Sequence, residues 1–484
     1  MRPVLRVLRA VTLTGPSALA FASGGYFDHA RLVALIVAWA LAAAAVALSD
    51  APLPRSREGV AALGALAGYA GWIALSTTWA PLKGPAGADM ERAILYLGAF
   101  VAVAAAFRPR SAARAVEPGL AAGAFVVTGY GLVGRLLPGI VHQHATASSA
   151  GRLDQPLTYW NATGALAALG LVLCTRIAGD NDRRGELRAA AAAAAVPLAA
   201  GVYLSFSRGA LAALAAGIIV LLVAAPSWIQ LRAAAICLEA GALAIAACAA
   251  FGGVRDLAGS THTREVEGAI VFVALLALMA AAAAVAIWAQ RAERAGTTRL
   301  GPLPLPRWAP LAAAGLVVAI VVVPVLVAKG TSTATPQFGE TAGRFSSVGS
   351  NRYEYWKVAL QVAADHPLAG VGASGFAVEW LKRRDISDAA RDAHSLELET
   401  LAEYGLVGFA LLCALLLAVA LAARRVHRYD PGLAAGPIAA LTLWALHAAI
   451  DWDWEMPALT LVALVLAGML VAQARAPSAD RPAA

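Results

Sequence analysis

Arg208 is the first residue of this sequence whose type and position suit chemistry. It lies between two apolar runs and is the only cation in the short connection at 204–209. A permanent charge beside hydrocarbon is costly and is typical of a functional site. The alternative is an anchoring arginine, whose stem follows the apolar surface while its head stays in water. Position alone leaves both interpretations open.

His394 is the second candidate. Neutral imidazole accepts a hydroxyl proton near neutral pH, so a histidine here can act as a base or position an acceptor. The alternative is a structural histidine at a helix start, satisfied by Asp392.

His447 and Asp451 lie one helical turn apart, at i and i+4, near the end of an apolar run. Trp452, Asp453, Trp454 and Glu455 follow them. Aromatic faces and carboxylates suit sugars, so this stretch is a candidate substrate-binding segment. The alternative is an aromatic belt at the membrane interface with a structural His–Asp pair.

The spacing of potential ligands does not favour a metal. His394 and Glu397 are at i and i+3, but no second set accompanies them, and Asp451 with Asp453 forms one weak pair. The sequence has neither a phosphate-binding loop nor a Rossmann glycine pattern. We therefore expect no metal site and no cofactor.

The elements that must position these residues are membrane helices. Of the 484 residues, 60% are hydrophobic and 14% are charged, against about 25% charged in ordinary domains. The apolar runs are about 20 residues long, enough to cross about 30 Å of hydrocarbon. This excludes a soluble enzyme, a secreted disulfide scaffold and a disordered chain. It predicts an all-α, polytopic membrane protein, and nucleic acid is not an expected partner.

About 14 transmembrane helices are predicted, at 8–24, 31–48, 59–78, 92–107, 113–134, 158–175, 187–204, 209–225, 232–251, 267–289, 308–328, 404–423, 433–450 and 456–473. They divide the chain into an N-terminal group (1–150), a central group (151–328), a long loop (329–403) and a C-terminal group (404–484).

The charges predict the sidedness of these spans. Alternate connections between the spans carry 22 of the 38 cations. Eight of the others lie in the long loop, and the charges of a long loop do not determine membrane topology reliably. Both termini are therefore expected to be cytoplasmic and the loop external.

The long loop contains two predicted amphipathic helices, from Asn351 to about 364 and from 376 to 384, and a helix that starts near His394 and enters the next span. Asn351 is a candidate N-cap. Tyr353, Trp356 and Trp380 suit the membrane–water boundary, so the loop should lie on the membrane.

The loop resembles the O-antigen ligase and O-antigen polymerase family. The resemblance rests on Asn351-Arg352 with Trp356, on His366 to Gly372, and on His394-Ser395 followed by Leu401 to Gly408. The sequence is similar to two further segments of the family. One contains Gly151-Arg152 and Tyr159-Trp160-Asn161, and the other contains Ser207-Arg208-Gly209. Ser395 departs from it, because many members have asparagine there.

This resemblance implies a GT-C-like glycosyltransferase of the bacterial inner membrane. Such an enzyme transfers a glycan from a polyprenyl-pyrophosphate lipid to a glycan, lipid or protein acceptor at the external face, without a metal. It implies Arg208 and Arg352 as pyrophosphate ligands, because guanidinium binds phosphate in a fork, and His394 as base or acceptor-positioning group. Arg152, Tyr159, Asn161, His447 and Asp451 are the expected substrate-binding residues. Polymerase and ligase remain open. A lipid or glycolipid transporter is the alternative, for which Glu239 is the clearest ionisable residue inside a span.

Overall fold

A computed structural model describes residues 2–50, 52–143, 146, 149–296, 301–328 and 350–474. The first part of the long loop, residues 329–349, lies outside these ranges. Within them the regular structure is helical, and one isolated antiparallel bridge joins Ser227 to Pro302. The long helices are α1 (Arg2–Ala20), α2 (Asp28–Leu48), α3 (Arg57–Ser76), α4 (Lys83–Ala106), α6 (Val116–Leu136), α7 (Trp160–Gly179), α8 (Gly185–Leu204), α9 (Arg208–Ala224), α10 (Trp228–Ala250), α12 (Thr261–Arg294), α13 (Ala309–Ala328), α16 (Leu396–Tyr429), α17 (Pro431–Ala448) and α18 (Pro457–Gln473).

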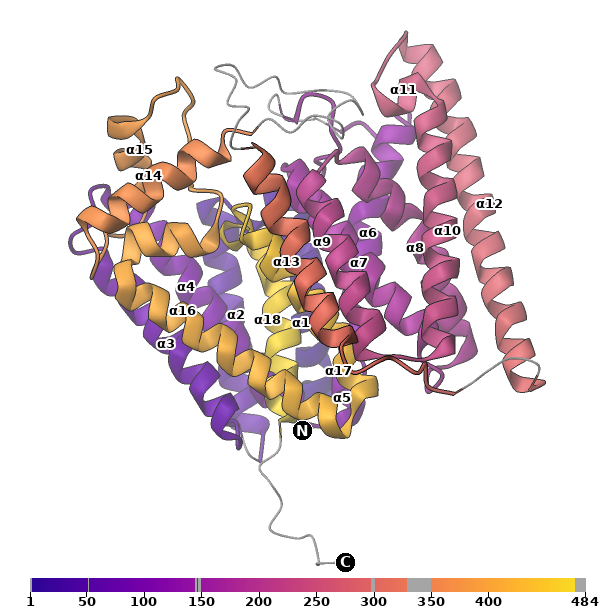
Figure 1. The fold of residues 1–484 in the computed structure, drawn as a ribbon, viewed down its shortest axis with the longest axis horizontal. Helices are drawn as coiled ribbons and strands as arrows, with labels where there is room; N and C mark the ends of the chain where they lie inside the picture. Colours follow the sequence, from indigo (N-terminus) through magenta and orange to yellow (C-terminus); the bar gives the residue numbers. More distant parts are fainter. Residues whose placement is uncertain are drawn as a thin grey trace, which may run out of the picture.

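Each of the predicted spans falls on one of these helices (Figure 1). In the described part of the chain, nine helical segments are long and apolar enough to cross a membrane: α2, α3, α5 (Arg110–Ala113) continuing into α6, α7, α8, α10, α12, α16 and α17. The chain is therefore an all-helical, polytopic membrane protein. The count of fourteen stays a prediction, because helices such as α9 and α18, with 17 residues each, are short for a span.

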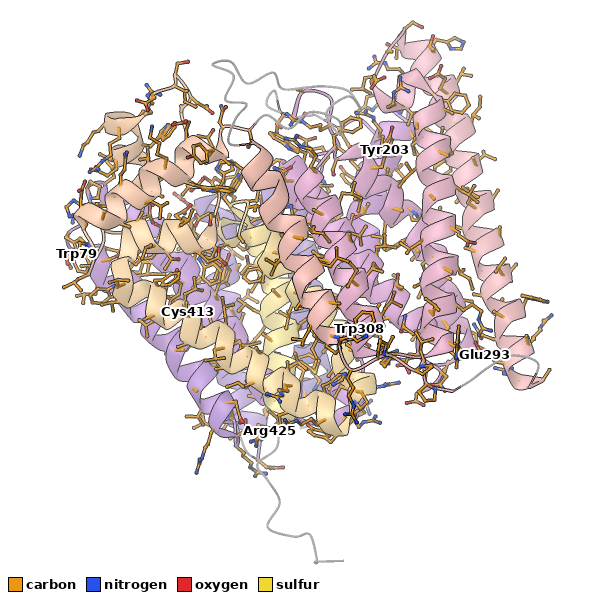
Figure 2. All side chains as sticks on the ribbon, viewed as in Figure 1. Trp79, Tyr203, Glu293, Trp308, Cys413 and Arg425 are labelled. Atoms are coloured by element: carbon orange, nitrogen blue, oxygen red, sulfur yellow. The ribbon has the colours of Figure 1, made fainter. Side chains whose placement is uncertain are left out.

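Ion pairs join the connections that the charge pattern assigned to one side. Arg188 binds Glu293, and Arg425 binds Glu58, with N–O distances of 2.9 and 2.8 Å. Figure 2 shows Glu293 and Arg425 at one end of the bundle, the end from which α1 starts. The short helices α14 (Arg352–Asp365) and α15 (Phe376–Arg383) lie at the other end, which we call the site end.

The centre of the bundle is formed by α7 and α18. Every residue of α7 is buried, and so is α18 from Pro457 to Val471. Alanine and glycine recur along both helices, and small side chains let helix backbones approach closely in a membrane. Both helices begin at the site end, so their first residues and the turns before them are held by the most tightly packed part of the protein.

The long loop folds as predicted in its second half. The helices α14 and α15 match the expected ranges, and α16 begins at Leu396 and continues into its span. Gly405 interrupts α16 with φ 62° and ψ −164°, a conformation open to glycine. The peptide N–H of Leu406 donates to the Pro367 carbonyl at 2.8 Å. The stretch from His366 to Gly372 thus holds the bend of α16.

Two local predictions in this loop are wrong. Trp380 does not lie at the interface: it is fully buried, packs edge-on against Tyr355, and its indole N–H donates to the Asp388 carbonyl at 2.8 Å. The loop is long enough to bury this large ring in a small core of its own. Asn351 precedes α14, but its side chain donates to Asp388 at 2.9 Å and does not cap the helix.

Candidate functional site

Asp451 is the centre of a polar cluster at the site end. It is 1% exposed and lies in the turn between α17 and α18. Its Oδ2 atom accepts from the Arg352 guanidinium at 2.6 Å, and its Oδ1 atom accepts from the Tyr159 hydroxyl at 2.6 Å. The Asn161 side chain donates to that hydroxyl at 2.7 Å. Four predicted site residues, from three segments far apart in sequence, therefore form one bonded group.

The charges around Asp451 favour its ionised form. Burial alone raises the pKa of a carboxyl group, but Arg352 foremost, and His394 beside it, hold the pKa of Asp451 below its usual value. A buried carboxylate that is paired and hydrogen-bonded at both oxygens fixes the direction of its partners. Asp451 therefore orients Arg352, the first residue of α14.

Arg208 is the first residue of α9. Ser207 caps this helix, and its hydroxyl accepts from the Ala210 N–H at 3.2 Å. The Leu153 N–H donates to the Leu204 carbonyl at 2.9 Å, which joins the loop before α7 to the end of α8. Arg352 acts electrostatically on Arg208. The two arginines that the resemblance singles out are thus neighbours in space.

His394 lies in the same neighbourhood. Its backbone has φ 55°, an uncommon conformation for a residue with a side chain. Its Nδ1 atom lies 3.0 Å from the Asp392 carbonyl oxygen, and its ring packs at 5.1 Å on Tyr355. Burial is the largest influence and lowers the pKa of His394; Arg352 lowers it too, while Asp451 raises it. The net effect favours neutral imidazole, the form that can accept a proton.

Arg152 lies next to this cluster without a described bond to Asp451. It is 1% exposed, its guanidinium stacks 3.6 Å from the Trp160 ring centroid, and its Nε–H donates to the Ser149 carbonyl at 2.6 Å. Trp160 in turn packs on Tyr159, with ring centroids 5.0 Å apart. Arg152 therefore supports the loop that carries Tyr159.

The i and i+4 spacing of His447 and Asp451 does not make the two residues partners. His447 instead bonds through Nδ1 to Asp453, and both side chains have no exposure. The reason is that α17 ends at Ala448, so Asp451 does not continue on the same helix face. Beyond the helix end, the chain turns Asp451 toward Arg352 and Asp453 back toward His447.

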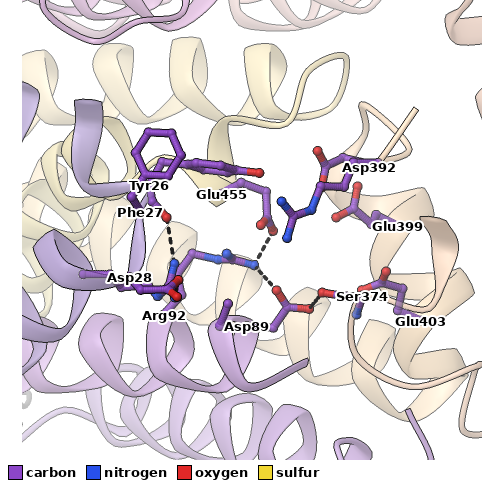
Figure 3. Close-up of a pocket in the computed structure, with 13 residues that line it drawn as sticks. Tyr26, Phe27, Asp28, Asp89, Arg92, Ser374, Asp392, Glu399, Glu403 and Glu455 are labelled. Carbon is purple, nitrogen blue, oxygen red and sulfur yellow. Dashed lines mark hydrogen bonds and ion pairs between the residues drawn. The ribbon is translucent and has the colours of Figure 1, made fainter. Parts of the chain in front are cut away.

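A second polar region, drawn in Figure 3, includes Asp392, whose carbonyl oxygen contacts the His394 ring. It surrounds a cavity of about 90 Å³. Arg92 of α4 binds Asp89, at 2.8 Å, and Glu455. The Ser374 hydroxyl donates to Asp89 at 2.7 Å, and Glu403 accepts from the Ser374 N–H at 3.1 Å. Figure 3 shows the carboxylates of Asp392 and Glu399 facing the same space.

Three of these carboxylates form a possible cation site. Oxygens of Asp392, Glu399 and Glu455 all lie within 4.8 Å of one another. Burial raises the pKa of Asp392 to about 6 and that of Glu455 to about 8. Carboxylate oxygens are ligands for hard cations such as Mg²⁺ and Ca²⁺. The expectation of a metal-free reaction therefore remains a prediction to be tested at these residues.

Spacing in the sequence does not reveal this second region. Asp89 and Arg92 are at i and i+3 in α4, and Glu399 and Glu403 are at i and i+4 in α16, but a charged face near a helix end is usually a solvated one. Their common cavity depends on how α4, α16 and the turn before α18 pack, which spacing within one helix does not reveal.

The chain matches a known protein family over part of its length. Residues 272–413 match the O-antigen ligase family. This segment contains α14, α15, Arg352 and His394, and it confirms the resemblance that the sequence motifs indicated. The chain is thus a polytopic membrane protein in which residues 272–413 are similar to the O-antigen ligase family, and the match supports glycan transfer of that general kind. No curated protein matches the chain.

Proposed function

We propose that this protein is a GT-C-like glycosyltransferase that transfers a glycan from a polyprenyl-pyrophosphate donor to an acceptor hydroxyl at the external face of the bacterial inner membrane. The observation that carries this proposal is the convergence of Arg352, Tyr159 and Asn161 on Asp451, next to Arg208 and His394. Both termini are proposed to be cytoplasmic.

In this reaction Arg208 and Arg352 stabilise the charge of the leaving group. The pyrophosphate gains negative charge as the glycosidic bond breaks, and two fixed guanidinium groups stabilise it without reorganising. His394 accepts the acceptor's proton or holds that hydroxyl in line. Tyr159 and Asn161 present hydroxyl and amide groups to the sugars, and Arg152 keeps their loop in place. No metal is assigned to the reaction.

Glycan profiling tests the proposal. In a strain that lacks the native protein, Arg208→Ala or His394→Ala should abolish long polysaccharide and accumulate lipid-linked units at normal expression. The matched controls are Arg255→Ala and His262→Ala, at positions outside the cluster, which should keep full-length polymer. Full-length polymer in both site variants would refute the catalytic assignment.

Polymerase and ligase differ in the acceptor. Purified protein supplied with lipid-linked repeat units alone should extend them if it is a polymerase. Product formed solely after a second acceptor is added would indicate a ligase.

The transporter alternative is less well supported. Glu239, the ionisable residue that best suited it, lies on the exposed face of α10. A transport path should instead carry such residues toward the interior of the bundle. The polar side chains that gather at the site end favour chemistry at one face.

A further inference from the structure

His447 and Asp453 form a buried pair that the proposed mechanism does not use. His447 lies in the last turn of α17, and Asp453 begins the short turn η4 (Asp453–Glu455). The carbonyl of Asp453 accepts from the Thr460 hydroxyl at 2.8 Å, which fixes the turn to α18. The pair is therefore held by α17 on one side and by α18 on the other.

The other ring nitrogen of His447 has an unusual environment. Its Nε2 atom is buried and has no hydrogen-bond partner in the described part of the chain. It lies against Gly209: a Cβ atom at this glycine would be 3.3 Å from Nε2 and 3.1 Å from Cδ1 of Ile450. A methyl group at this position would press on the His447 ring and on the Ile450 side chain. Gly209 directly follows Arg208, so His447 supports the turn of α9 that carries this arginine.

The Asp453 carboxylate binds Nδ1 of His447 and so fixes the ring with its Nε2 edge toward the start of α9. Arg208 directly precedes Gly209 in this turn. The position of the ring, and with it the contact to Gly209, therefore depends on Asp453.

We propose that the His447–Asp453 pair is a positioning unit that fixes the first turn of α9, and through it the place of Arg208 relative to Arg352. The inference rests on the proposed function, in which Arg208 binds the pyrophosphate. One turn, from Asp451 to Asp453, then sets both arginines: Asp451 bonds Arg352 directly, and Asp453 acts on Arg208 through His447.

A double-mutant cycle tests this unit. The full chain is purified in detergent, and the probe is inorganic pyrophosphate, whose affinity is measured by calorimetry. Asp453→Asn should weaken binding by about fivefold to tenfold, and Arg208→Ala by at least as much. The double variant should bind no more weakly than Arg208→Ala, because Asp453 acts through that arginine. With Arg352→Ala the effect of Asp453→Asn should persist.

The outcomes separate the two proposals. Additive losses for Asp453→Asn and Arg208→Ala would overturn the positioning unit. Unchanged pyrophosphate binding in Arg208→Ala would instead overturn the proposed function. His427→Gln is the matched control, because the His427 ring contacts the Ala224 carbonyl at the far end of α9, at 2.7 Å; its affinity should be unchanged.

A purely structural role is tested separately. The thermal midpoint of each variant is measured, and the positioning unit predicts lost affinity without a matching loss of midpoint. If Asp453→Asn does not fold, Gly209→Ala replaces it, since it disturbs the same contact from the side of α9. Wild-type affinity in Gly209→Ala would then overturn the proposal.

Discussion

Arg352 and Asp451, 99 positions apart in sequence, form an ion pair in which the guanidinium nitrogen lies 2.6 Å from the carboxylate oxygen. This pair joins the start of α14 to the turn before α18. It connects the long loop, which carries His394, with the buried centre of the bundle.

Asp451→Asn tests this connection. The amide keeps the shape but loses the charge and one of the two acceptor oxygens, so Arg352 and Tyr159 no longer both have an acceptor, and we expect the transfer rate to fall about 10- to 100-fold. Activity is measured with a lipid-linked donor in detergent. Tyr159→Phe removes the two hydrogen bonds of the Tyr159 hydroxyl but keeps the ion pair of Asp451 with Arg352, so it should cost less, about fivefold. A Tyr159→Phe loss larger than that of Asp451→Asn would contradict the central role of Asp451.

The pH dependence of transfer should report His394. Because burial lowers the pKa of His394 from its ordinary 6.5, the neutral base persists to lower pH, and activity should be lost as pH falls through a midpoint below 6.5. His394→Ala should remove this acid limb together with about 10²- to 10⁴-fold of the rate. An acid limb centred above 6.5 would exclude His394 as the titrating base.

The cavity carboxylates predict a second, opposite pH effect, on stability. Burial raises the pKa of Asp392 from 3.8 to about 6 and that of Glu455 from 4.5 to about 8. Their stabilising contribution is complete below the unfolded values and is lost as pH rises through the folded ones. The thermal midpoint should therefore fall between pH 5 and pH 9. Asp392→Asn should reduce the fall at its lower end; a midpoint that rises over this range would contradict the prediction.

Removal of divalent cations tests the metal-free reaction. Since two arginines supply the positive charge for the pyrophosphate, EDTA should leave the transfer rate within about twofold of its starting value. A rate abolished by EDTA and restored by Mg²⁺ would refute this. If Mg²⁺ restored the rate of the wild-type protein but not that of Asp392→Asn, the cation would be placed at Asp392, Glu399 and Glu455.

The bend of α16 should be sensitive to substitution. A Cβ atom at Gly405 would overlap the Leu368 carbonyl, and its φ of 62° with ψ −164° is nearly restricted to glycine. Gly405→Ala should destabilise the protein by about 1–3 kcal/mol, measured as a lower thermal midpoint. Gly71→Ala is the control, because a Cβ atom at this position in α3 meets open space. It should be neutral or slightly stabilising.

The sequence by itself determined the membrane architecture. Apolar runs of sufficient length become helices wherever backbone groups must bond within a segment, so all fourteen runs appear as helices. The alternation of cations predicted which connections share an end, and the ion pairs Arg188–Glu293 and Arg425–Glu58 agree with it. Amphipathic patterns likewise predicted the loop helices, and the motifs around Arg352, Gly370 and His394 indicated the family.

The tertiary structure alone decided the partners of the site residues. Spacing of i and i+4 suggested that His447 faces Asp451, but this rule holds within one helix and α17 ends at Ala448. Past that end, the packing of η4 against α18 places Asp451 beside Arg352 and Asp453 beside His447. Contacts between residues hundreds of positions apart depend on how helices pack, and no spacing within one segment records that packing.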